Sequence, residues 1–254
     1  MPFTLSHAVL APPLSKLTGH RLPIAALAIG CMVPDLIRLF SNSQDAHTHL
    51  WRALIQPDLW MGLAFALLWY ALYRPVIYRF LGIRHDLALH SFSSAIRFFI
   101  SISLAILLGT ATHIIWDGLT HVDFRTFAFH DWLSQNITLF QHSYPLHRIL
   151  QIGSSILALP IIGWMCRQYY RQYRNVISVS LKIKIFALTL LLLSLLVGAL
   201  STWDYARYFA PDIWRSELYF FIGKSINEFT QAALPVFTLG CLLFLFLDRG
   251  HRLN

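Results

Sequence analysis

Apolar residues fill most of this chain in runs of roughly 20 residues, the length a helix needs to cross the hydrocarbon core of a bilayer. Such runs predict transmembrane helices. A shorter apolar stretch, Thr4–Leu17, predicts a half-span or a re-entrant helix packed on protein. The full-length spans that we expect are Leu22–Phe40, Leu59–Leu81, Ile96–Trp116, Ile149–Cys166, Ile183–Thr202 and Phe229–Leu247. The pattern therefore predicts an all-α, polytopic transmembrane helix bundle of about six spans.

The overall composition agrees with a membrane protein. Hydrophobic residues make up 56% of the chain and charged residues only 13%, whereas soluble domains carry about 25% charged residues. No long polar stretch is available to form a separate soluble domain. We therefore expect one membrane domain over residues 1–254.

The Lys and Arg residues divide unequally between the two sides of the predicted bundle. If the spans alternate in direction, 13 of the 20 basic residues lie on one side and 7 on the other. Cytoplasmic loops carry the excess of Lys and Arg, so the side with 13 is predicted to be cytoplasmic. Most of the basic residues, which give the chain its net charge of +8, then lie in cytoplasmic loops that face anionic lipid headgroups. We expect membrane lipid, and no nucleic acid, as a partner, because no nucleic-acid-binding motif accompanies the basic residues.

Three ionisable residues, His113, Asp117 and His121, follow one another at four-residue spacing near the end of the third predicted span. Four residues advance a helix by about 400°, so the three side chains should share one face. Two imidazoles and a carboxylate on one face are typical ligands of a divalent metal. An ionisable group within a span raises the free energy of membrane insertion, so such groups are functional candidates. The alternative is a polar stripe that forms hydrogen bonds between helices.

The same topology gathers further metal-binding residue types near the non-cytoplasmic face. Asp35 follows Pro34 at the end of the first span and is either a carboxylate ligand or a helix-terminal residue that faces water. A lone histidine in an apolar segment is usually a core residue, and histidines in loops are commonly exposed. The candidates that join the triplet at this face are His7, Asp35, His47, His49, His142 and His147.

Several of these motifs together resemble one bacterial integral-membrane family known as a domain of unknown function. The resemblance lies in the start Met1–His7, Gly30 followed by Pro34-Asp35, the His47-x-His49 loop and the spaced triplet. That family is similar to inner-membrane, metal-dependent hydrolases. The resemblance implies a multi-pass protein of the bacterial inner membrane. It also implies a set of site residues: His7, Asp35, His49, His113, Asp117 and His121.

Taken together, these patterns favour a membrane-bound hydrolase with a divalent metal, most simply zinc, near the non-cytoplasmic face. A metal-activated water would attack a lipid or lipid-linked ester or phosphoester, with Asp35 as the catalytic base. The expected metal ligands are His7, His49, His113, Asp117 and His121, and the residues expected around them or near the substrate are His47, His142 and His147. The alternative is a transporter or scaffold whose histidines and aspartates bind ions or relay protons.

Overall fold

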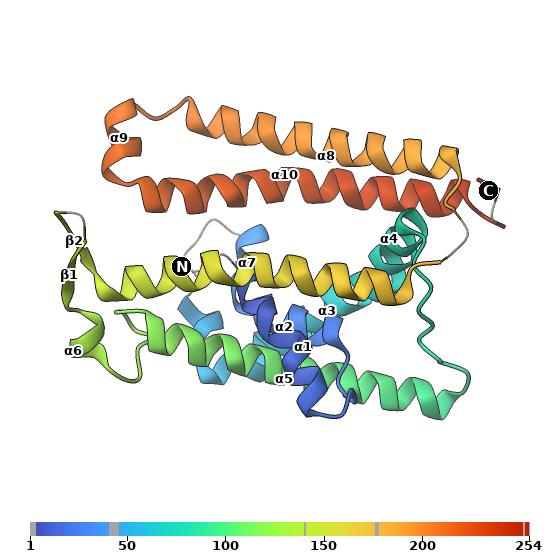
Figure 1. Cartoon of the computed structure of the whole chain (residues 1–254), viewed down its shortest axis with the longest axis horizontal. Helices are drawn as coiled ribbons and strands as arrows, with labels where there is room; N and C mark the ends of the chain where they lie inside the picture. Colours follow the sequence, from blue (N-terminus) through green and yellow to red (C-terminus); the bar gives the residue numbers. More distant parts are fainter. Residues whose placement is uncertain (1–3, 41–45, 140, 176–177, 251, 254) are drawn as a thin grey trace. The chain divides into compact units, whose positions relative to one another are not determined.

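The computed structural model describes residues 4–40, 46–139, 141–175, 178–250 and 252–253, and nearly all of its regular structure is helical (Figure 1). The all-α class is therefore confirmed. The first three residues of the Met1–His7 motif lie outside the described residues. The chain divides into two compact units. The first comprises Met1–Ile37, Ser43–Ala66 and Leu87–Tyr169, and the second comprises Arg38–Asn42, Leu67–Asp86 and Tyr170–Asn254. A single membrane domain stays a prediction, which this division does not test.

The chain begins with short helices and continues with long ones. In chain order the first elements are η1 (Thr4–Leu10), α1 (Ala11–Leu17), α2 (Ile24–Leu36), η2 (Ile37–Leu39), η3 (Ala46–His49), η4 (Trp51–Leu54), η5 (Ile55–Leu59), α3 (Trp60–Leu68), η6 (Trp69–Tyr73), α4 (Arg74–Leu81) and α5 (Phe92–Thr120). They are followed by α6 (His130–Leu133), strands β1 (Asn136–Leu139) and β2 (His142–Pro145), α7 (Leu146–Tyr173), α8 (Leu181–Ala206), α9 (Pro211–Ser216) and α10 (Leu218–Leu247). The strands pair antiparallel, with Leu139 opposite His142.

Five helical stretches in the described part of the chain are long and apolar enough to cross a membrane. They are Trp51–Leu81, Phe92–Thr120, Leu146–Tyr173, Leu181–Ala206 and Leu218–Leu247. Many of their large side chains are exposed, for example Leu188, Leu192 and Leu196 along α8, as expected for surfaces that face lipid. These helices support a multi-pass membrane protein.

The first expected span, Leu22–Phe40, is shorter than the sequence predicts. Its regular part is α2, which has 13 residues and is followed by the three residues of η2. At 1.5 Å per residue, 13 residues extend about 20 Å, against the roughly 30 Å of a hydrocarbon core. Pro34 lies in the last turn of α2, where a proline favours the end of a helix. Asp35 is thereby placed at a helix end, as the sequence predicts.

Helices α2 and α5 cross at unusually close range, and two glycines permit this. A Cβ atom on Gly109 would lie 2.5 Å from the carbonyl oxygen of Leu27 and 2.7 Å from the backbone nitrogen of Cys31, and one on Gly30 would overlap the backbone of Ile106. At this crossing Thr110 Oγ1 donates a hydrogen bond of 3.2 Å to the Gly30 carbonyl. The crossing sets the ends of both helices beside each other, and the candidate site lies there.

The second unit is an apolar scaffold built on α8 and α10, which run side by side (Figure 1). Its core contains Phe244 and Cys241 from α10, Ile183 from α8 and Val76 from α4. At one end the Nε atom of Arg79 donates to the Asp248 carboxylate at 3.0 Å. All nine residues that the sequence predicts for the site lie in the first unit.

Candidate metal centre

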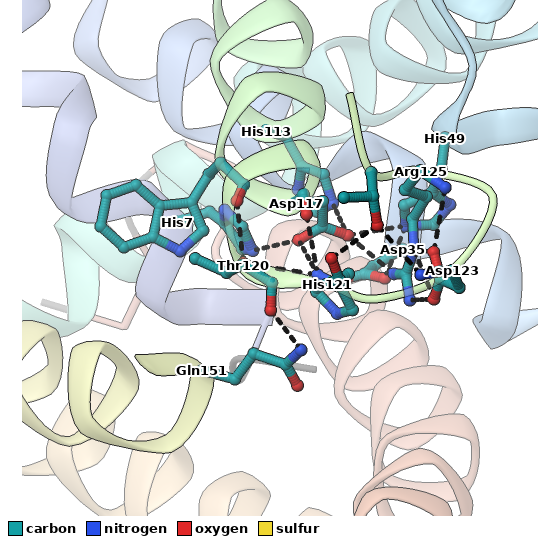
Figure 2. A network of polar contacts seen from close by, with 12 residues as sticks. His7, Asp35, His49, His113, Asp117, Thr120, His121, Asp123, Arg125 and Gln151 are labelled. Carbon is teal, nitrogen blue, oxygen red and sulfur yellow. Dashed lines mark hydrogen bonds and ion pairs between the residues drawn. The ribbon is translucent and has the colours of Figure 1, made fainter. Parts of the chain in front are cut away.

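Six of the predicted site residues converge in the first unit from four parts of the chain (Figure 2). His7 comes from η1, Asp35 from α2, His49 from η3, and His113 and Asp117 from α5. His121 lies one residue beyond α5, where the backbone is already extended (φ −116°, ψ 157°). Each of the six is at most 5% exposed. Helical spacing therefore brings His113 and Asp117 to the same face of α5, whereas His121 reaches the site from the end of the helix.

Five atoms of the expected metal ligands, one from each residue, lack a hydrogen-bond partner among the described residues. They are His7 Nε2, His49 Nε2, His113 Nε2, Asp117 Oδ1 and His121 Nε2. Burying a polar atom without a partner costs on the order of 1–3 kcal/mol, and such atoms are few in folded proteins. All five are atom types that ligate divalent metals. Their number at one place is what a group of residues that could hold a metal ion would show.

Two of the histidines, His113 and His121, are held in a tautomer that leaves Nε2 as the possible metal ligand. The Nδ1 atom of His113 lies 2.8 Å from the Cys31 carbonyl oxygen, and that of His121 lies 3.1 Å from the Asp117 carbonyl oxygen. A carbonyl only accepts, so Nδ1–H donates in both rings and the lone pair is on Nε2. Hydrogen bonds from the second nitrogen of this kind orient metal-binding histidines.

His49 is oriented through a hydroxyl group. Its Nδ1 lies 3.2 Å from Thr48 Oγ1, which itself donates to the Pro34 carbonyl at 2.8 Å. With its proton engaged there, the hydroxyl accepts from Nδ1–H, which leaves the His49 Nε2 lone pair facing the centre.

Distances within the cluster match those between atoms that share one metal. Asp117 carboxylate oxygens lie 3.6 Å from Nε2 of both His49 and His113 and 3.8 Å from Nε2 of His7. Two ligands at 2.0–2.1 Å from a tetrahedral zinc ion lie about 3.4 Å apart. Two overlapping groups of residues have ligand atoms within 4.8 Å of one another and could each hold a metal ion. They are His7, Asp35 and His113, and His49, His113 and Asp117. Asp117 and His113 are therefore at the middle of the cluster, and His121 belongs to neither group.

Burial keeps the imidazoles outside the spans neutral. It lowers the pKa of His7 to about 3 and that of His121 to about 4, because a charged ring is poorly solvated there. His7 also stacks on His113, with ring centroids 3.9 Å apart. A neutral imidazole offers its lone pair to a metal at neutral pH.

Three predicted residues lie away from this cluster. His47 is exposed and its Nδ1 lies 3.2 Å from a terminal nitrogen of Arg52. His142 is exposed on β2, and the half-buried His147 has its Nδ1 3.3 Å from the Leu133 carbonyl oxygen. None of the three belongs to the candidate metal groups of the described residues. The three residues are close in sequence to segments that contribute to the cluster, but their rings do not join it.

Sequence reasoning missed Arg125, which lies at the edge of the cluster. Its Nη1 donates to Asp117 Oδ2 at 2.8 Å, and its Nε donates to Asp123 Oδ1 at 2.9 Å (Figure 2). Arg125 lies in the loop after α5, where no periodicity of the sequence relates it to Asp117.

Polar side chains from other elements hold the cluster in place. Thr4 Oγ1 donates to Asp35 Oδ2 at 2.9 Å, and Ser6 Oγ donates to the Ser155 carbonyl at 3.3 Å. From α7, Gln151 Nε2 donates to the Thr120 carbonyl at 2.6 Å. These bonds fix η1 and the end of α5, and with them His7 and His121.

A family model described as "Domain of unknown function (DUF4184)" matches residues 1–244. The chain belongs to this family. The DUF4184 match covers every residue of the candidate metal centre, and it confirms the resemblance to an uncharacterised membrane family. No curated protein and no solved structure is detectably similar to the chain.

Proposed function

We propose that this chain is a membrane-bound, metal-dependent hydrolase whose one or two divalent ions are held by His7, His49, His113, Asp117 and His121. The observation that carries the proposal is the set of five buried ligand atoms without hydrogen-bond partners among the described residues. Mixed histidine and carboxylate ligands suit Zn²⁺, and Mn²⁺ and Fe²⁺ accept the same set. We propose Zn²⁺ as the bound ion.

The roles of the two aspartates follow from their neighbours. Asp117 lies within 3.8 Å of imidazole nitrogens from His7, His49, His113 and His121, so it is the central ligand. The Asp35 carboxylate lies 3.3 Å from His49 Nε2, and its Oδ2 accepts from Thr4 Oγ1. Asp35 is therefore the better base, placed beside the ligands to take a proton from water.

A bound divalent ion supplies a water with a pKa near neutrality. The Asp35 carboxylate would take a proton from that water, and His7 and the other imidazoles would hold the ion as neutral ligands. The cluster lies at the end of a predicted span and beside the loop that carries Asp123 and Arg125. This depth near the membrane interface favours a lipid or lipid-linked ester or phosphoester as the substrate.

Hydrolysis by the purified full-length chain tests this function. The protein is stripped with a chelator, reloaded with Zn²⁺ and assayed against a panel of lipid esters and phosphoesters. Turnover by loaded protein and its loss in stripped protein are expected. A loaded protein without turnover on any member of the panel would contradict the hydrolase and favour an ion-binding protein.

One observation favours a second function, that of a proton or ion relay. Asp58 is 0% exposed, and neither carboxylate oxygen has a hydrogen-bond partner among the described residues. It lies in the membrane-crossing stretch Trp51–Leu81, where a buried carboxylate is a candidate for transport. A relay predicts that reconstituted protein dissipates a proton gradient and that Asp58→Asn does not. The hydrolase predicts that Asp58→Asn retains its zinc and its turnover.

A further inference from the structure

Arg125 joins the buried cluster to its more exposed edge. Its side chain is 12% exposed and that of Asp123 is 35% exposed, whereas the side chains of His113 and Asp117 are at most 1% exposed. Arg125 and Asp123 belong to the loop that follows α5, outside the span Phe92–Thr120. A ligand that approaches the cluster from this edge meets the guanidinium group before it meets Asp117.

The guanidinium group is fixed in orientation and has unused donors. Asp123 accepts from Nε and Nη2, and Asp117 accepts from Nη1. An arginine has five N–H groups, so these contacts leave one N–H on each terminal nitrogen. Among the residues described in the structure, no other acceptor takes these two. Terminal N–H groups of arginine are common donors to phosphate oxygens.

We propose that Arg125 makes the cluster a phosphate-binding site, so that the substrate is a phosphoester with its phosphate oxygens shared between the ion and Arg125. This inference rests on the proposed metal centre. A carboxylic ester is uncharged before reaction and gains little from a permanent cation beside the ion. A phosphoester already carries negative charge, which the guanidinium group stabilises from binding onward.

The carboxylates around Arg125 make phosphate binding depend on the metal. Asp35, Asp117 and Asp123 carry three negative charges against the single positive charge of Arg125, so the metal-free cluster repels an anion. The two positive charges of a divalent ion offset this excess of negative charge. Hydrolysis then forms a bond from the water oxygen to phosphorus and breaks the bond from phosphorus to the alcohol oxygen. Asp35 takes the water proton, and the leaving oxygen takes a proton from solvent at the exposed edge.

Calorimetric titration of inorganic phosphate into purified full-length protein tests the inference, after the zinc content of each sample has been measured. We expect binding to zinc-loaded wild type and none to stripped protein. Arg125→Gln should retain zinc and weaken phosphate binding by about 10- to 100-fold, which corresponds to the loss of hydrogen bonds to a charged group. Arg125→Lys should be intermediate, because it keeps the charge and loses the paired donors.

The matched control is Arg52→Gln, since Arg52 is an exposed arginine that contacts His47. It should bind phosphate as wild type does. If zinc-loaded Arg125→Gln binds phosphate as tightly as zinc-loaded wild type does, the inference is overturned and Arg125 is only a counter-ion of Asp117. Zinc-loaded wild type that binds no phosphate would also overturn it, while the metal centre stands. Absence of zinc from wild type would instead refute the proposed function itself.

Discussion

His113 of α5 donates its Nδ1 proton to the carbonyl oxygen of Cys31 in α2, across 2.8 Å. The bond joins the two helices one turn beyond the crossing at Gly109. It also leaves Nε2 of His113 as the ligand nitrogen, 3.6 Å from Asp117 Oδ2. The packing of two helices thus determines which nitrogen of a candidate ligand faces the centre, so helix packing and metal binding should fail together.

Substitution of Gly109 tests this coupling. In Gly109→Ala the new methyl group would meet the Leu27 carbonyl oxygen and the Cys31 backbone, so α2 and α5 must separate. We expect a loss of stability of about 1–3 kcal/mol, typical of overpacking, together with weaker zinc binding. Thermal unfolding and zinc titration measure both.

Gly153→Ala is the matched control, because a Cβ atom on this helical glycine meets nothing within 4 Å. It should bind zinc as wild type does and be at least as stable. Wild-type zinc affinity in Gly109→Ala would show that the crossing does not position the ligands.

The two aspartates should separate metal binding from catalysis. Asp35→Asn keeps the size of the side chain and removes its basicity, so we expect zinc to remain and turnover to fall by at least about 10²-fold, the lower range for a general base. Asp117→Asn should lose zinc, because Asp117 contacts four imidazoles. Elemental analysis and initial rates distinguish the variants. Equal loss of zinc in both would make Asp35 a ligand and leave another group as the base.

Acid should destabilise the metal-free protein through its buried imidazoles. Burial lowers the pKa of His121 to about 4 from an ordinary value of 6.5. Between these two pH values the unfolded chain takes up a proton at His121 and the folded chain does not, so stability falls as pH falls. We expect the melting temperature to drop less steeply from pH 6.5 to 4 in His121→Gln than in wild type. Parallel profiles would show that His121 is not buried as a neutral ring.

The orientation in the membrane is tested by labelling single cysteines. Asn136 and Gln172 are exposed positions before and near the end of α7, and the distribution of basic residues places Asn136 outside the cytoplasm. Cysteines introduced there should react from opposite sides, after the exposed Cys166 has been replaced by serine. Labelling of both from one side would refute the predicted topology.

Local sequence patterns and tertiary packing contributed differently to the site. The spacing of His113 and Asp117 predicts their common face, since helical periodicity is a local property. Convergence of His7, Asp35 and His49 depends on the crossing of α2 and α5. The predicted topology brings these residues only to the same membrane face, and the family resemblance implies them as site residues. The position of His142 outside the cluster has a similar cause. His142 is exposed on β2, which pairs with β1, and a short polar segment does not reveal this pairing.

Two further residues escaped prediction for a physical reason. Arg125 lies in an irregular loop, where no period relates it to Asp117. Asp58 lies just before α3, and in the sequence it is a single charged residue between two apolar runs. Only the structure shows that it is buried. Burial of a single polar residue is decided by neighbours distant in sequence, which composition and hydropathy do not identify.

Zinc content of the purified chain tests the central claim most directly. Elemental analysis of wild type should find about one or two divalent ions per chain, as expected for one compact set of ligands, and the double variant His113→Ala/His121→Ala should have none. The exposed control His142→Ala should retain the wild-type content. Full metal content in the double variant would contradict the account and leave the buried histidines and aspartates as a structural network between helices.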